Sequence, residues 1–214
     1  MSTSVWSNVQ VAMESASSTA LTITAISKAN PAVVTYTGTD PVNGDVVVLS
    51  VQGMYQLDKR AVRVANVNGV ANTFEIEGCD STLYDTFTSG TATPKTLGTS
   101  FSTIAEFSVS GGDFDMIDTT TIHDSQKQNQ PGAASATEIS GSVNWDPTDA
   151  GQTAMKTASD AKAQKVFKVT FANGYKWLFN GYVGYVGSPT GQAQGKATAP
   201  FKISCQGRPM FYST

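Results

Sequence analysis

Residues 139–155, ISGSVNWDPTDAGQTAM, contain a sharp change from a strand pattern to a helix start. Ile139 to Trp145 form the strand-like run. The pair Asp146-Pro147 indicates a helix start, because an aspartate can accept hydrogen bonds from the first free N–H groups and proline suits the first helical position. Asp149 adds a second carboxylate near the positive end of the helix dipole. The stretch therefore predicts one strand followed directly by one helix, over residues of about 147–163.

The predicted helix has a narrow face of small residues, at Ala150, Ala154, Ala158 and Ala161. We expect this face to lie close against a sheet. Lys162 and Lys165 are placed to complement the negative end of the helix dipole. The 139–155 stretch contains no nucleophile motif, metal-ligand spacing or phosphate-binding loop, so we interpret it as a structural corner.

The segments around this corner have strand patterns. Asn173-Gly174 separates two alternating runs and predicts a two-residue type I′ hairpin. A first strand is expected at Val9 to Met13, and another follows residue 101, with Ile104 and Phe107 on opposite faces. Phe167, Val169 and Phe171 are expected on one face of the first run, and Tyr175, Trp177 and Phe179 on the matching face beyond the turn. A final strand is expected to carry Phe201, Ile203 and Cys205 on one face.

Residues 20–95 read as a compact all-β module with its own small core. Short runs rich in Val, Ile, Thr and Phe alternate with turn signals such as Asn30-Pro31, Asn68-Gly69 and Gly78. The stretch TSGTATPKTLGTS, residues 88–100, is small and polar and is interpreted as a linker. Residues 111–137 are long, polar and poorly periodic, which predicts an exposed arm or contact loop.

The bulk composition describes a folded, weakly charged protein. The 214 residues are 40% hydrophobic and 14% charged, with a net charge of −3. A net charge of this sign and size does not indicate a basic surface that binds nucleic acid. The beginning of the chain lacks the features of a signal peptide, and no stretch approaches the ~20 apolar residues of a membrane helix. We therefore expect a soluble protein made in a cytoplasm, with no membrane partner.

Candidate chemical sites are weak. His123 lies among Asp113, Asp115, Asp118 and Asp124, but this acidic segment lacks the glycine and final glutamate of a calcium loop, and a solvated loop is the preferred interpretation. No serine lies in a G-x-S-x-G context, although a carboxylate pair drawn from Glu106, Glu138 and Asp146 stays open.

The remaining candidates also favour structural roles. The set Tyr175, Trp177, Phe179 and Tyr182 fits a core or an interface better than a sugar-stacking surface. The loop at residues 187–200 lacks the G-K-[ST] ending of a phosphate loop. Cys79 and Cys205 are interpreted as buried free thiols in preference to a disulfide. We predict no catalytic, cofactor-binding or metal-binding residue and no cofactor.

Two parts of the sequence resemble known families. DTTTIHDSQKQNQPGAASATEISGSVNWDPTDAGQTAMKTA, followed by FKVTFANGYKWLFNGYV, resembles the tail tube proteins of long-tailed (siphovirus-type) bacteriophages, in the order of its loop, strand, helix and hairpin. The inner part, with NGDVV, MYQLDKRAVRVANV and NTFEIEG, is similar to a small β-barrel module of phage tail proteins and to the first catalytic-cysteine half-domain of ubiquitin-activating enzymes. No ubiquitin chemistry is implied by the second likeness.

The first resemblance implies a mainly β fold, an antiparallel β-sandwich or barrel with one helix. Residues 1–19 and 96–214 would form this core, and residues 20–95 an inserted small β-barrel domain. It also implies a non-enzymatic virion protein, made in the host bacterial cytoplasm, whose rings, hexamers by analogy, stack into a tube for DNA ejection. Its implied partners are further copies of itself, the tape measure, tail tip and terminator proteins, and double-stranded DNA that passes without specific binding. The alternative is a β module that binds carbohydrate or a cell surface.

Overall fold

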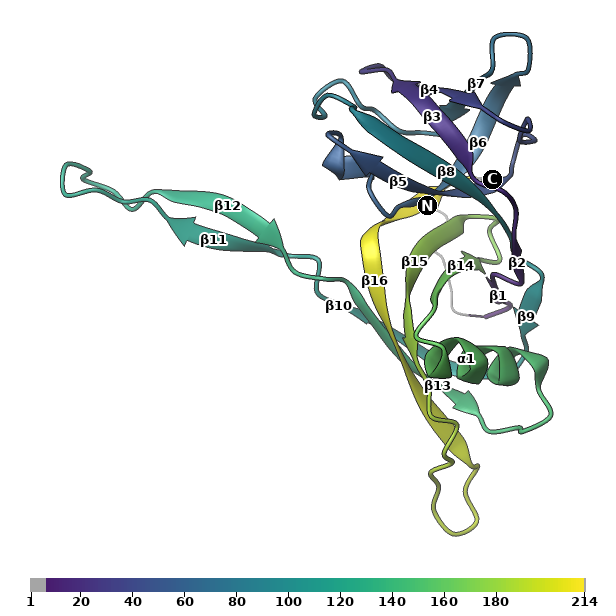
Figure 1. Cartoon of the computed structure of the whole chain (residues 1–214). Helices are drawn as coiled ribbons and strands as arrows, with labels where there is room; N and C mark the ends of the chain where they lie inside the picture. The colour runs from purple at the N-terminus through teal and green to yellow at the C-terminus, as the bar shows by residue number, and fades with distance from the viewer. Residues whose placement is uncertain (1–6, 214) are drawn as a thin grey trace.

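The computed structural model describes residues 7–213 and is mainly β, as predicted. Its described strands form a lower sheet, an upper sheet and a separate two-stranded hairpin, and one α-helix covers part of the lower sheet (Figure 1). The predicted segment 1–19 is described from residue 7 onward, and its residues 1–6 lie outside the described part.

The lower sheet has seven antiparallel strands in the order β10-β13-β16-β15-β14-β1-β9. Three chain segments contribute to it, so both ends of the described chain are needed to complete it. Its strands are β1 (Gln10–Met13), β9 (Thr99–Phe101), β10 (Ile104–Ser110), β13 (Glu138–Asn144), β14 (Gln164–Thr170), β15 (Lys176–Gly184) and β16 (Thr198–Tyr212).

One core fills the inside of the lower sheet. Phe167, Phe179 and Trp177 stack in sequence there, with Phe167 and Phe179 only 5.4 Å apart between ring centroids. Helix α1 (Ala150–Asp160) lies against β15 and β9 and adds Met155 to the same core. Phe201, Ile203 and Cys205 are buried on one face of β16, as their alternation predicted.

The upper sheet closes on itself. Its order is β2-β8-β3-β4-β7-β6-β5, and β5 also pairs with β8, which makes a small barrel. A second core of aliphatic side chains, Tyr36 and Phe74 fills it. Its elements are β2 (Ala16–Ser17), β3 (Leu21–Ile26), β4 (Ala32–Thr37), β5 (Val46–Gln52), a 3-10 turn η1 (Tyr55–Leu57), β6 (Ala61–Asn68), β7 (Thr73–Ile76) and β8 (Ser89–Thr96).

The upper barrel and the lower sheet share a third, smaller apolar cluster. Val166, Leu178 and Tyr212 of the lower sheet pack against Val46 and Ala61 of the barrel. The Tyr212 hydroxyl also accepts a hydrogen bond from the Arg63 backbone N–H at 2.9 Å. The lower sheet is therefore buried on both faces near this seam, which explains why Leu178 is buried between Trp177 and Phe179.

The helix is shorter than predicted, and its start was assigned to the wrong aspartate. Asp149 is the N-cap, because its side chain accepts a hydrogen bond from the Gln152 N–H at 2.8 Å. Asp146 instead accepts from both the N–H and the hydroxyl of Thr148, which makes a separate turn before the helix. Pro147 lies in that turn and not at the first helical position.

The buried face of α1 is also rotated from the alanine stripe. The buried helix residues are Gly151, Gln152, Met155 and Ala158, whereas Ala150 and Ala161 are exposed. The close approach of α1 to β9 depends on Gly151, because a Cβ added there would lie 2.6 Å from the ring of Phe101. The predicted charge complement is also absent, since the last helical turn contains no basic residue.

Three local predictions along the strands were wrong. Residues 88–100 are not a linker, because β8 pairs with both β3 and β5 inside the barrel. The turn at Asn173-Gly174 has three residues, with Phe171 N–H bonded to the Tyr175 carbonyl and the positive φ at Gly174, a type I turn with a bulge. A bulge after Ile104 shifts the register of β10, so Ile104 and Phe107 both reach the core.

Candidate functional surfaces

His123 and its neighbouring aspartates lie in an exposed segment and serve its turns. Hydrogen bonds from Thr120 lower the pKa of Asp118, which also pairs with Lys127 at 3.3 Å. Hydrogen bonds from Thr121 lower the pKa of Asp124 in the same way. Among residues 7–213, no group of three or more His, Cys, Asp or Glu side chains is arranged to hold a metal ion.

The three carboxylates considered for hydrolysis do not converge. Glu106 is opposite Ser142, and Glu138 is opposite Ser110, so the two glutamates lie at opposite ends of the β10–β13 ladder. Glu138 pairs with Lys202 at 2.7 Å. Asp146 is bound into its own turn, and hydrogen bonds from Thr148 lower its pKa.

The aromatic set of β15 is divided between the core and the surface. Trp177 and Phe179 are buried, whereas Tyr175 and Tyr182 are about half exposed. They form no common stacking platform. Cys79 and Cys205 are free and buried, as interpreted from the sequence, and burial raises the pKa of the Cys205 thiol to about 12. The loop between β15 and β16 is a hairpin connection closed by a bridge between Thr190 and Thr198.

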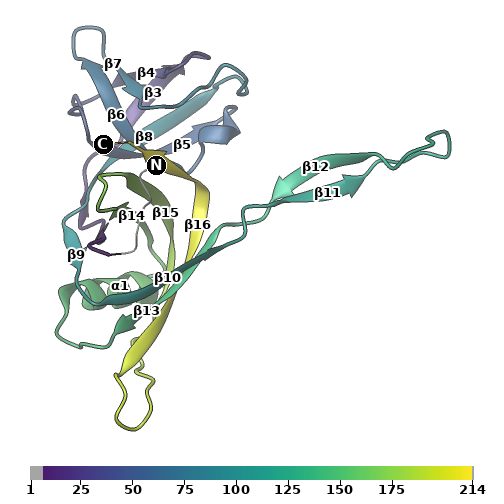
Figure 2. The same ribbon diagram turned by 180° about the vertical axis from the view of Figure 1, so that it is seen from behind.

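The segment of residues 111–137, here called the arm, is the most prominent feature of the surface. Its strands β11 (Phe114–Asp118) and β12 (Asn129–Ala134) pair only with each other, and the arm points away from both sheets (Figures 1 and 2). The exposed-arm prediction is confirmed, although its strands were not foreseen. Every residue of β11 is exposed, including Met116 and Ile117 at 67% and 56%. Ile122 beyond them is 97% exposed.

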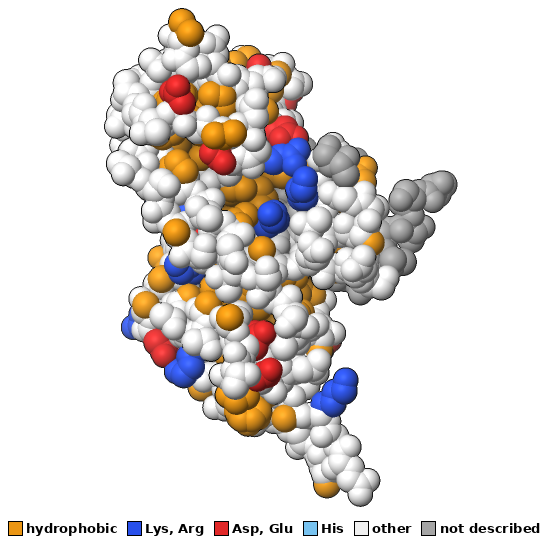
Figure 3. Space-filling view, turned by 90° about the vertical axis from the view of Figure 1, so that its right-hand side faces the viewer, with side chains coloured by type: hydrophobic (Ala, Val, Ile, Leu, Met, Phe, Trp, Pro, Cys, Tyr) orange, Lys and Arg blue, Asp and Glu red, His pale blue; other side chains and the backbone are white. Residues whose placement is uncertain are grey.

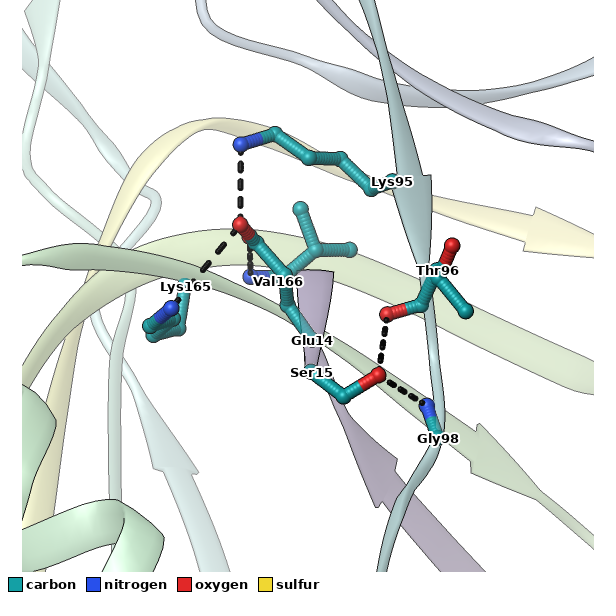
Figure 4. Close-up of polar contacts among 7 residues, drawn as sticks. All are labelled: Glu14, Ser15, Lys95, Thr96, Gly98, Lys165 and Val166. Atoms are coloured by element: carbon teal, nitrogen blue, oxygen red, sulfur yellow. Dashed lines mark hydrogen bonds and ion pairs between the residues drawn. The ribbon is translucent and has the colours of Figure 1, made fainter. Parts of the chain in front are cut away.

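A buried carboxylate joins the upper and lower sheets. Glu14 is only 6% exposed, and its carboxylate forms ion pairs with Lys95 at 2.9 Å and with Lys165 at 3.9 Å (Figure 4). The same carboxylate accepts a hydrogen bond from the Val166 N–H at 3.2 Å. The next residue, Ser15, belongs to the same junction. Its hydroxyl donates a hydrogen bond to the Thr96 carbonyl and accepts one from the Gly98 N–H. These ion pairs could not be predicted from the sequence, because nothing around a single Glu after a short strand indicates which distant lysines will pair with it.

The seam around this junction is visible on the molecular surface. On the face shown in Figure 3, Lys and Arg side chains gather where the upper and lower parts meet, with hydrophobic side chains between them. Apart from that view, Lys95 and Lys165 are both mostly buried and both face Glu14. The single carboxylate of Glu14 is shared between the two lysines, so this ion-pair group is part of the joint between the two sheets. No helix among the described residues is long and apolar enough to cross a membrane.

Comparison with known proteins shows which family the sequence matches. Residues 52–214 match the model of the phage tail tube protein family. No curated protein matches the chain significantly. Among solved structures, the chain is similar to a chain of the tail of an empty GTA particle with C6 symmetry, at 16% identity and a TM-score of 0.40, over 52% of this chain and 83% of that chain. A structural likeness this weak supports no conclusion about assembly.

Proposed function

The chain belongs to the phage tail tube protein family, and from this premise we propose that it assembles as stacked rings, hexameric by analogy, around a channel for DNA ejection. The proposed role is structural and non-catalytic. It places the protein in the virion tail after synthesis in the host bacterial cytoplasm. The tape measure, tail tip and terminator proteins are its proposed partners besides further copies of itself.

The observation that carries this proposal is the isolated arm. A two-stranded hairpin is marginally stable in water unless it packs on something else. Among residues 7–213, the strands of the arm pair only with each other, and beyond its base the arm presents Met116, Ile117 and Ile122 to solvent. A contact with another subunit would cover these side chains. Where the arm meets a different surface of the next subunit, the contact is heterologous and can propagate from subunit to subunit without closing on itself.

The charge distribution is compatible with a conduit for DNA. The arm has four aspartates and one lysine, so it accounts for the whole net charge of −3, and the rest of the chain is neutral. A strongly basic surface would release counterions from the duplex and retain it. A neutral body with an acidic arm supplies little of that attraction, which suits DNA that passes without specific binding.

We further propose that residues 20–95 are a domain inserted into the tube core of residues 1–19 and 96–214. The closed barrel and its separate core support this division. Its similarity to the half-domain of ubiquitin-activating enzymes stays a prediction. The pairing of β2 with the end of β8, Ala16 with Thr96 and Ser17 with Lys95, brings the two ends of the proposed insertion together and so supports it.

Negative-stain electron microscopy of the purified full chain tests the proposed function. We expect rings or hollow tubes at high protein concentration. A chain that stays strictly monomeric at every concentration would contradict the proposal. A glycan array on the same preparation addresses the carbohydrate-binding alternative, and specific binding by a monomer would favour that alternative.

A further inference from the structure

A groove of about 930 Å³ lies where the barrel, the base of the arm and β16 meet. Tyr55 and Tyr84 line it from the barrel, Phe114 from the arm base, and Trp177 and Phe211 from the lower sheet. Tyr55 and Phe211 are 70% and 69% exposed, which is unusual for aromatic side chains in a concave site. Groups of aromatic side chains in such grooves are typical of sites that receive a partner.

One polar group of a groove-lining side chain has no hydrogen-bond partner among residues 7–213. Trp177 is only 4% exposed, and its indole N–H is buried with no hydrogen-bond acceptor among the described residues. An indole nitrogen is a donor only, so it needs an acceptor oxygen from elsewhere. Phe211 lies parallel to Trp177 at 5.7 Å and is mostly exposed, so its ring is the one that an occupant would displace.

The groove also has a positive edge. Arg208 is exposed and lies over Phe114, at 4.8 Å from the ring centroid. Arg60 also lines the groove, but it is only 8% exposed, lies over Tyr84 at 6.0 Å and donates to the Met210 sulfur at 3.7 Å. Asp58 adds one negative charge to the lining, and its carboxylate accepts a hydrogen bond from the Val51 N–H. The two arginines have no carboxylate partner among the ion pairs of the described residues. The groove thus favours an apolar occupant with acidic groups and free acceptor oxygens.

The arm has this chemistry. It has exposed Met116, Ile117 and Ile122, a net charge of −3, and free strand edges with unpaired backbone carbonyls. The arm of the same chain cannot fill the groove, because the groove lies at its base and the arm points away from it (Figures 1 and 2).

We propose that the groove formed by Tyr55, Tyr84, Trp177 and Phe211 is the receptor for the outer part of the arm of a second copy. This inference rests on the proposed function and adds the receiving site to it. An apolar arm side chain enters between the aromatic rings, an arm oxygen accepts from the Trp177 N–H, and an arm aspartate approaches the exposed Arg208. Each copy then offers one arm and one groove, so the contact runs head to tail.

Site-specific photo-crosslinking in assembled tubes tests the receptor. A benzophenone amino acid replaces Ile122 in the full chain, and mass spectrometry maps the crosslinks between copies. Replacement of Val70 is the matched control, because Val70 is 98% exposed at the tip of the β6–β7 hairpin, outside the arm and the groove. We expect Ile122 crosslinks at Tyr55, Tyr84 or Phe211 and none there from Val70.

Tubes whose Ile122 crosslinks map outside the groove, or whose arm forms none between copies, overturn the receptor but leave the proposed function standing. If the Ile122 variant fails to assemble, the same probe at Met116, which is also exposed, replaces it. If the unmodified chain forms no tubes or rings, the proposed function fails and the receptor fails with it. As a second readout, a chain with Trp6→Phe and Trp145→Phe leaves Trp177 as its only tryptophan. Its emission should shift on assembly, and an unchanged spectrum in tubes contradicts the receptor.

Discussion

The barrel of residues 20–95 and the arm of residues 111–137 both extend beyond the lower sheet, but they differ in what stabilises them. The barrel buries a core of its own and closes its strand pairing. The arm has paired strands and almost no buried side chain. We therefore expect the barrel to fold from its own contacts and the arm to gain its stability from contacts with another copy.

This difference separates stability from assembly. Changes in the barrel or at its seam should alter the free energy of unfolding of the single chain. Changes in the arm should leave that free energy almost unchanged and should alter association between copies.

Deletion of the arm should abolish assembly. Residues 114–134 can be replaced by an Asn-Gly turn, because Ser135 N–H already bonds to the Asp113 carbonyl at 2.8 Å. The unfolding free energy of the single chain should change by less than ~0.5 kcal/mol, since the removed side chains are exposed. Sedimentation velocity and chemical denaturation measure the two effects. Tubes that form without the arm would remove the main support for the proposed function.

Deletion of residues 20–95, with a short Gly/Ser bridge, should leave a folded lower sheet of reduced stability. Val166, Leu178 and Tyr212 lose their cover, and Glu14 loses Lys95, so we expect a loss of about 2–4 kcal/mol. Leu178→Thr in the shortened chain should improve its solubility. Circular dichroism and denaturation check this. An unfolded product would mean that the barrel is part of the core and not an insertion.

Replacement Glu14→Gln should cost about 2 kcal/mol of unfolding free energy, because Lys95 would lose its carboxylate in a mostly buried place. Urea denaturation measures the loss. Glu106→Gln is the matched control, since Glu106 is exposed and should change stability by less than ~0.5 kcal/mol. Equal effects of the two variants would contradict the role of Glu14 as the joint between the sheets.

Replacement Asp149→Ala should cost about 1 kcal/mol, the usual loss for an N-cap. Asp146→Ala should cost less, because its partner Thr148 is exposed and its turn precedes the helix. Thermal unfolding of the two variants ranks them. The opposite ranking would restore the helix start that the sequence suggested.

The sequence was informative wherever a local pattern determines local structure. The alternation of apolar and polar residues predicted which face of β16 carries Phe201, Ile203 and Cys205. Turn signals at hairpin spacing predicted the short strands within residues 20–95. Failures occurred where distant contacts decide. Strand β8 looks like a linker because Ser, Gly, Thr and Pro fill it, and it becomes a strand only through β3 and β5. The junction at Glu14 and the groove at Trp177 join residues more than 80 positions apart, so no local pattern could show them.

We propose that the arm gains its stability from a neighbouring copy, whereas the barrel has its own. Hydrogen–deuterium exchange of backbone amides in single chains and in assembled tubes tests this proposal. We predict slow exchange in the barrel in both states, with fast exchange of β11 and β12 in single chains and slow exchange in tubes. An arm already protected in the single chain, or still unprotected in the tube, would contradict the account.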